Sequence, residues 1–239
     1  MHLGLIGGIG PAATEFYYRN LVRAHVAANL AMELTIVHAD MHGLIQNISD
    51  NAPDKQAQMF LLLTLRLQAA GAEAVAVTSI AGHFCIRELE VLSPLPVINA
   101  IPKIEAALVN RGLRRVGLLG TRVVMQSRLY GGINAVDVVL PQGESFDATH
   151  NAYVAMASNG QADDQQRDLL FSVGNDLCRK QGAEAVLLAG TDLFLAFDGH
   201  DCGFPTMDCA RVHIDALFRE SVEVSRATSG ACAANRGTS

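Results

Sequence analysis

The chain alternates short, almost wholly apolar runs with longer stretches that mix apolar and polar residues. The apolar runs Leu3–Ile6, Leu34–His38 and Ala74–Val77 predict strands that are buried on both faces. The longer stretches, from Pro11 to about Asn29 and over Asp54–Ala70, predict helices, and proline suits the first turn of a helix. Strands that alternate with helices indicate an α/β fold with parallel sheets and right-handed crossovers.

The same pattern occurs twice along the chain. The segment Leu3–Gly8 (LGLIGG) is similar to Val116–Thr121 (VGLLGT), and Gly71–Val75 (GAEAV) recurs unchanged as Gly182–Val186. The offsets of the two matches, 113 and 111 residues, are nearly equal. A common helix-to-strand junction would explain either match alone, but the shared offset predicts a duplication.

We therefore expect two pseudo-symmetric, Rossmann-like domains with parallel sheets and one cleft between them. The expected division is residues 1–100 plus 207–226 for the first half, 101–206 for the second half, and a disordered tail at 227–239. Ligands bind parallel sheets at the carboxyl ends of the strands. The residues after the two repeated strands should then face each other across the cleft; they are Thr78–Ala81 and Ala189–Asp192.

Composition excludes several classes of function. The net charge of −6, without a basic run, argues against a nucleic-acid-binding protein. No apolar run approaches the roughly 18 residues of a membrane span, and the N-terminus lacks the pattern of a signal peptide. The five cysteines are odd in number, irregularly spaced and without a CxxC pair. This pattern predicts reduced thiols and a cytoplasmic location.

The glycine turn Gly7–Pro11 lies between a predicted strand and a predicted helix. Free N–H groups at such a helix start bind anions, so Gly8 and Ile9 are candidate residues for binding a substrate carboxylate. A purely structural turn and a dinucleotide fingerprint, Gly8-x-Gly10-x-x-Ala13, are the alternatives. The fingerprint is weak because the first acidic residue after the next strand, Asp40, lies too far along the chain. Thr121 follows the matching strand of the second half and is a candidate for the same role.

Ser79 follows a buried strand, and His83 lies one helical turn beyond it. A histidine can polarise a serine hydroxyl, so the two residues are candidate catalytic groups, with Ile80 and Ala81 beside the substrate. The alternative is that Ser79 caps a helix and His83 only packs or lies on the surface. In the second half, Thr191 and Asp192 are candidate substrate-binding residues, and Thr191 could bind a carboxylate. For Asp192 the favoured alternative is that it caps the helix that follows it.

His38, Asp40 and His42 alternate along the chain and suggest a metal site. Metal sites usually need further ligands and supporting hydrogen bonds, and none is evident in the sequence. We therefore expect no metal.

Several segments resemble aspartate/glutamate racemases. Leu3–Tyr18 is similar to their opening GGMGP-type segment, and Val116–Tyr130 to their second glycine segment; Leu95–Asn99 and Phe204–Asp208 also resemble family segments. The resemblance implies a two-domain pseudo-symmetric fold and PLP-independent proton transfer on a small amino acid or carboxylate. It implies no cofactor, and it implies a homodimer, since family members are often dimers. In these enzymes two cysteines on opposite faces of the substrate exchange its α-proton.

The chain departs from the family at both cysteines. Ser79 stands where the first motif, C/T-N-T-x-H, has its first residue, and Gly190 stands where the second motif, G-C-T-E/D, has its thiol. No lysine lies near Ser158, where relatives that act on acidic amino acids carry one. Proton transfer is therefore expected to be altered or weakened. The alternatives are a non-catalytic carboxylate-binding protein, a lyase or decarboxylase of the same superfamily, or a thiol relocated to Cys85 or Cys209.

Overall fold

A computed structural model describes the backbone of residues 1–234 and the side-chain environment of residues 1–223. Its strands form two parallel sheets, which confirms the predicted α/β class. The first sheet has the order β2-β1-β3 and the second the order β5-β4-β6-β7. The strands are β1 (His2–Gly7), β2 (Glu33–His38), β3 (Ala74–Val77), β4 (Arg115–Leu119), β5 (Asp137–Val139), β6 (Ala185–Leu188) and β7 (Thr206–Asp208).

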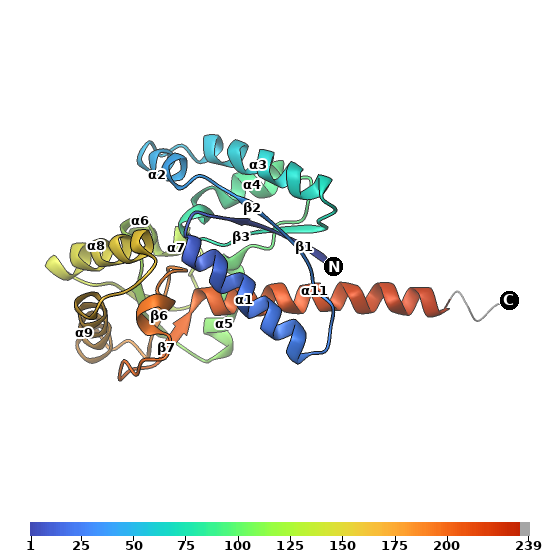
Figure 1. Cartoon of the computed structure of the whole chain (residues 1–239). Coiled ribbons are helices and arrows are strands. Elements are labelled where there is room, and N and C mark those ends of the chain that lie inside the picture. The colour runs from blue at the N-terminus through green and yellow to red at the C-terminus, as the bar shows by residue number, and fades with distance from the viewer. Residues whose placement is uncertain (235–239) are drawn as a thin grey trace.

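Helices connect the strands and cover both sheets (Figure 1). Before β4 they are α1 (Pro11–Ala27), α2 (Met41–Ser49), α3 (Pro53–Ala69), the 3₁₀ turn η1 (Ala81–Cys85), α4 (Ile86–Leu92) and α5 (Ala100–Asn110). After β4 they are α6 (Arg122–Gln126), α7 (Arg128–Gly131), α8 (Glu144–Asn159), α9 (Asp164–Gln181), α10 (Phe194–Phe197) and α11 (Cys209–Ala234). Within the described part of the chain, no helix is long and apolar enough to cross a membrane.

The first sheet is buried on both faces because its strands have apolar residues at consecutive positions. Leu3 and Leu5 of β1 pack toward α1 and α11, while Ile6 belongs to the core on the side of α3. This alternation is the period of two expected for a strand. Figure 1 shows the same layers, with α3 and α4 on one side of the sheet and α1 and α11 on the other.

The two sheets repeat one strand register. Leu3 of β1 pairs with Ala74 of β3, and Val116 of β4 pairs with Ala185 of β6. These four positions are related by the offsets found in the sequence. The repeated segments therefore occupy equivalent places in the two sheets.

A side-chain contact is repeated as well. The carboxylate of Glu73 accepts the backbone N–H of His2 at 2.6 Å, and the carboxylate of Glu184 accepts that of Arg114 at 2.6 Å. Glu73 and Glu184 are the glutamates of the two GAEAV segments. Each one ties the start of its strand to the neighbouring strand of its own sheet.

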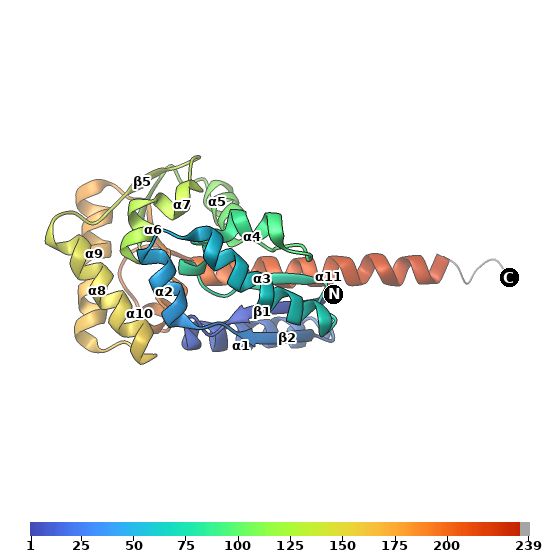
Figure 2. The same cartoon turned by 90° about the horizontal axis from the view of Figure 1, so that it is seen from above.

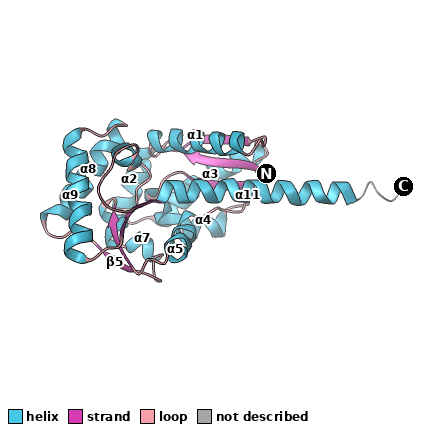
Figure 3. Ribbon diagram, turned by 90° about the horizontal axis from the view of Figure 1, so that it is seen from below, coloured by secondary structure: helices cyan, strands magenta, loops and turns pink. Residues whose placement is uncertain are grey.

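The end of the chain differs from the expected division. Strand β7 pairs with β6, so residues 206–208 belong to the second sheet, and the chain leaves it only at Cys209. Helix α11 then packs against α1 and α5, which carries the chain back to the first sheet (Figures 2 and 3). The helix continues to Ala234, where a disordered tail was expected from residue 227; extending an established helix adds one hydrogen bond per residue. Residues 235–239 lie outside the described residues.

Candidate functional site

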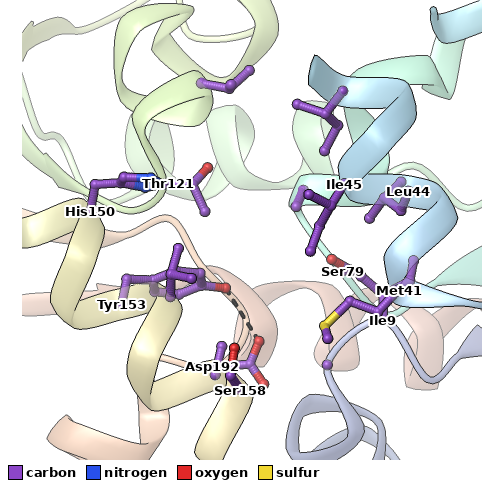
Figure 4. Close-up of a pocket in the computed structure, with 16 residues that line it drawn as sticks. Ile9, Met41, Leu44, Ile45, Ser79, Thr121, His150, Tyr153, Ser158 and Asp192 are labelled. Atoms are coloured by element: carbon purple, nitrogen blue, oxygen red, sulfur yellow. Dashed lines mark hydrogen bonds between the residues drawn. The ribbon is translucent and has the colours of Figure 1, made fainter. Parts of the chain in front are cut away.

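The carboxyl ends of four strands meet at a cavity of about 270 Å³ between the two sheets (Figure 4). Ile9 follows β1, Ser79 follows β3, Thr121 follows β4 and Asp192 follows β6, and all four line the cavity. The remaining lining residues are Gly10, Met41, Leu44, Ile45, Ile48, Ala81, Val123, His150, Tyr153, Val154, Ala157 and Ser158. Loops from both sheets therefore share one cavity, as the repeat predicted.

Two helices supply most of its wall. From α2 come Met41, Leu44, Ile45 and Ile48, and from α8 come His150, Tyr153, Val154, Ala157 and Ser158. Within each set the spacing follows i, i+3, i+4, i+7, which places the residues on one helix face. Neither face was predicted above, although the helical period of apolar residues in Met41–Ile48 and in His150–Ser158 is the signal that indicates them.

Ser79 lies at the cavity wall and is 4% exposed. Its hydroxyl oxygen accepts the backbone N–H of Gly82 at 3.4 Å, which supports the first turn of η1. The side chain thus lines the cavity and caps a helical turn at the same time.

His83 does not form the predicted pair with the Ser79 hydroxyl. Its Nδ1–H donates to the Ser79 carbonyl oxygen at 2.7 Å, and its Nε2 accepts the N–H of Ala100 at 3.3 Å. The ring is fully buried and lies outside the cavity wall, and burial lowers its pKa from 6.5 to about 4. The prediction of a Ser–His pair is wrong because both ring nitrogens bind backbone groups, and the packing alternative describes the residue.

Gly190 lies behind the cavity wall, where the ring of Tyr153 covers it. A Cβ atom at position 190 would overlap the edge of that ring. Tyr153 comes from α8, and its hydroxyl donates to the Asp192 carboxylate at 3.2 Å. The volume that a side chain at residue 190 would occupy is thus filled by an aromatic ring.

The Asp192 side chain, in the second half of the chain, forms a hydrogen bond with the first half. Its Oδ1 accepts the N–H of Ala13 in the first turn of α1 at 3.1 Å, and its Oδ2 accepts the hydroxyl of Tyr153 (Figure 4). The expectation that it caps the following helix is wrong, since α10 has no side-chain cap. Burial raises the pKa of the Asp192 carboxyl from 3.8 to about 6, although both hydrogen bonds favour the charged form.

The same bond corrects the predicted carboxylate seat at the glycine turn. The helix start of α1 already holds a carboxylate, that of Asp192, while the N–H of Gly8 donates to Thr14 Oγ1 at 2.9 Å. Gly8 lines a different hollow, beside Tyr18 and His38. Of the two residues predicted for this role, only Ile9 lines the cavity.

The opposite side of the cavity is formed by the start of α6. Thr121 Oγ1 accepts the N–H of Val124 at 3.4 Å, and His150 Nδ1 accepts the N–H of Arg122 at 3.1 Å. Because Nδ1 accepts, the proton of the neutral imidazole lies on Nε2. Burial, followed by the nearby Arg122 charge, lowers the pKa of His150. A neutral imidazole therefore lines the cavity at pH 7.

The other predicted binding residues divide between the wall and the interior. Ala81 lines the cavity, whereas Ile80 and Thr191 are each 1% exposed and lie behind it. The Thr191 hydroxyl has no hydrogen-bond partner among the described residues. Buried hydroxyls usually have one, so Thr191 is a polar group held in the core next to the site.

Neither candidate cysteine reaches the cavity. Cys85 and Cys209 are fully buried and belong to the hydrophobic core. Burial raises the pKa of the Cys85 thiol to about 12, and burial with the charge of Asp208 raises that of Cys209 well above its ordinary value. The structure therefore gives no support for a relocated catalytic thiol.

The suggested metal trio does not share one strand face. Strand β2 ends at His38, while the Asp40 carboxylate caps α2 by accepting the N–H of Gly43 at 2.7 Å, and His42 lies within α2. Among the described residues, no three His, Cys, Asp or Glu side chains are grouped so that they could hold a metal ion.

Solved structures with this fold come from several amino-acid racemases. An aspartate racemase homologue from Pyrococcus horikoshii is 22% identical, with a TM-score of 0.77 over 92% of this chain and 99% of that one. Aspartate racemase from Picrophilus torridus is 19% identical, with a TM-score of 0.76 over 92% and 94% of the two chains. Glutamate racemase from Francisella tularensis, solved with D-glutamate, is 11% identical, with a TM-score of 0.62 over 94% and 82%. At these identities the likeness establishes the fold.

A match to a family model shows a closer relationship than the shared fold does. The family model described as Asp/Glu/Hydantoin racemase matches residues 6–217. This range includes every residue of the cavity wall, the last two residues of β1 and all of the other strands. This chain therefore belongs to the Asp/Glu/Hydantoin racemase family.

Proposed function

We propose that the chain catalyses cofactor-independent proton transfer at a carbon atom of a small amino acid or carboxylate, bound between Ser79 and Asp192. The observation that carries the proposal is the buried Asp192 carboxylate, which lines the cavity beside the position of the missing thiol. Family membership supports an isomerase-type reaction. The resemblance to the family aligns Ser79 and Gly190 with its two catalytic cysteines, so the proposed reaction differs from two-thiol racemisation.

Asp192 is the group best suited to accept a proton. Its pKa of about 6 keeps it mostly ionised at pH 7 and near the range in which a general base is effective. The Ala13 N–H and the Tyr153 hydroxyl fix the carboxylate in place. In the proposed step, Asp192 takes the α-proton, the electron pair passes into the adjacent carboxyl group, and the proton then returns from Asp192 to carbon.

Ser79 lies on the facing wall (Figure 4). A serine hydroxyl without a base is a weak acid and a weak base, and its histidine neighbour is turned to backbone groups. We therefore assign Ser79 to hydrogen bonding with the substrate rather than to proton delivery. With one base on one face, exchange of the α-proton should be faster than inversion of the carbon atom.

A second candidate function is binding without turnover. It is favoured by the hydrogen bonds on both Asp192 oxygens, since a carboxylate that caps α1 and binds Tyr153 already has a structural role. In that case the cavity would retain a ligand, and none of its residues would transfer a proton.

Exchange of α-protons with deuterated water separates the two candidates. The parent protein is incubated in D2O with a panel of amino acids and 2-hydroxy acids, and loss of the α-proton signal is followed by NMR, with chiral chromatography of the same samples. We expect exchange on at least one compound, at about tenfold or more the rate of inversion, and a loss of about 100-fold in Asp192→Asn.

The matched control is Asp168→Asn, an exposed carboxylate on α9, which should exchange at the parental rate. Absence of exchange with every compound, or an unchanged rate in Asp192→Asn, would refute proton transfer by Asp192. Ligand binding without exchange would establish the second candidate instead.

We also propose a cytoplasmic location and a homodimer. Support for the location comes from Cys85, Cys178, Cys202 and Cys209, which form no disulfide. Support for the dimer is the resemblance to a family whose members are often dimers. Sedimentation analysis tests the dimer, and fractionation of the source cells tests the location.

A further inference from the structure

We propose that the ligand of the cavity is an α-amino acid with an uncharged aliphatic side chain rather than an acidic one. The inference rests on the proposed function only in placing the ligand in this cavity. It is carried by the chemistry of the cavity wall, which offers a broad apolar surface and one carboxylate, and in which none of the described residues is a Lys or Arg.

The apolar surface is formed by the facing sides of two helices. Met41, Ile45 and Ile48 of α2 and Val154 and Ala157 of α8 all line the cavity, and the two helices lie on opposite sides of it (Figure 4). Each methylene of a ligand that is buried against such a wall strengthens binding about fourfold. A branched aliphatic side chain gains this contribution, whereas a carboxylate placed there would lose its hydration without a partner.

The charges around the cavity also favour an uncharged side chain on the ligand. Asp192 places a carboxylate at the cavity, and His150 is held in its neutral form by its surroundings. The guanidinium of Arg122, next to Thr121 in the chain, is paired with the Asp147 carboxylate at 2.6 Å. A ligand with a net negative charge, such as aspartate, is therefore repelled by Asp192 and meets no Lys or Arg among the described lining residues, while an aliphatic amino acid carries no net charge.

Polar groups for the α-carboxylate lie at one end of the cavity. Thr121 has a hydroxyl there, and His150 has a protonated Nε2, because its Nδ1 accepts the N–H of Arg122. A few polar groups at one end of an otherwise apolar cavity are the usual way in which a site orients a small ligand. The α-carboxylate would face Thr121 and His150, with the side chain against the apolar wall.

Binding of leucine and aspartate tests the inference directly. Both enantiomers of each are titrated into the full-length protein at pH 7 by isothermal calorimetry, with saturation-transfer NMR for weak binding. We expect leucine of at least one configuration to bind about tenfold or more tighter than either enantiomer of aspartate. Equal or tighter binding of aspartate, or no binding of leucine by either method, would overturn the inference.

A single substitution should reverse the preference. Val154 is 41% exposed at the cavity mouth, so Val154→Lys adds a cation there without burying it fully. We expect Val154→Lys to shift the leucine-to-aspartate affinity ratio about tenfold or more toward aspartate. The matched control is Val91→Lys on α4, where the side chain is 85% exposed, and it should leave the ratio unchanged.

The outcomes keep this inference separate from the proposed reaction. Leucine binding without α-proton exchange would leave the ligand class standing and remove the proton transfer. Exchange on aspartate without leucine binding would do the opposite. A Val154→Lys protein that is folded by circular dichroism and keeps the parental affinity ratio would contradict the assignment of the apolar wall to the ligand side chain.

Discussion

Asp192, which follows β6, caps helix α1 by accepting the N–H of Ala13, 179 residues earlier in the chain, at 3.1 Å. The contact requires a glycine at residue 10, since a Cβ atom there would lie 2.6 Å from one carboxylate oxygen. A helix start stabilises a negative charge, so the bond joins the two halves of the molecule at the cavity. The Asp192 carboxylate thus occupies the position at the start of α1 where an anionic ligand was expected to bind.

The charge on Asp192 should make stability depend on pH in a definite direction. Because the folded-state pKa of about 6 lies above 3.8, the contribution of Asp192 is fully present below pH 3.8 and is lost as the pH rises through 6. The loss is roughly 3 kcal/mol at 1.36 kcal/mol per pKa unit. Asp192→Asn removes this titration, so the variant should gain stability relative to the parent between pH 4 and 7.

Urea unfolding at a series of pH values measures the difference between the two proteins. Asp168→Asn, which changes an exposed carboxylate, should run parallel to the parent at every pH. Parallel profiles for Asp192→Asn as well would show that the Asp192 carboxyl titrates normally in the folded protein.

The contact between Gly190 and Tyr153 predicts a coupling between two substitutions. In Gly190→Ala the new methyl group overlaps the Tyr153 ring, and overpacking of this kind costs about 1–3 kcal/mol. In a Tyr153→Ala background the same change should cost at least about 1 kcal/mol less. Urea denaturation of the four proteins gives the coupling energy. The control, Ser158→Ala, further along α8, should combine additively with Gly190→Ala. A coupling energy of zero between Gly190→Ala and Tyr153→Ala would contradict the contact between the Tyr153 ring and residue 190.

The sequence predicts the sheets better than it predicts the contacts of the site. The GAEAV repeat and the two glycine strands predict equivalent strand positions because a parallel register follows from matched apolar runs and matched crossovers. The partner of Asp192 could not be predicted in this way. A capping aspartate is expected to accept an N–H of the helix that directly follows it. The packing of the two halves instead brings the Asp192 carboxylate to the N–H of Ala13. The helical period places Tyr153 on the cavity face of α8, but its contact with Gly190 could not be predicted, because only tertiary packing brings the ring there.

The buried imidazole of His83 gives a second pH dependence, of opposite sign to that of Asp192. Its folded-state pKa of about 4 lies below 6.5, so its contribution is complete above pH 6.5 and is lost as the pH falls through 4. The loss is about 3 kcal/mol. The ring of His213, whose centroid lies 5.9 Å away, is also buried and neutral, and it adds to the acid sensitivity of the parent.

Replacing His83 should flatten the stability profile between pH 6.5 and 4. His83→Asn loses stability at neutral pH because the Ser79 carbonyl and the Ala100 N–H lose well-placed partners. The diagnostic readout is the slope of the unfolding free energy against pH, which should be smaller than in the parent. His200→Asn, at an exposed position, serves as the control and should keep the parental slope.

A left-handed turn in α7 offers a site where stability can be increased. Arg128, Leu129 and Tyr130 have φ angles of 50°, 57° and 57°, a conformation that costs an ordinary residue about 1–2 kcal/mol. Arg128 is exposed, so Arg128→Gly relieves this strain without removing a packed side chain. After the larger backbone entropy of glycine in the unfolded chain is subtracted, we expect a gain of about 0.5–1 kcal/mol. The control is Arg87→Gly, at an exposed position in helix α4, which should lower the free energy of unfolding by about 1 kcal/mol.

Chemical denaturation of the two variants measures both changes. A loss of stability in Arg128→Gly equal to that in Arg87→Gly would show that residue 128 is not in the left-handed conformation.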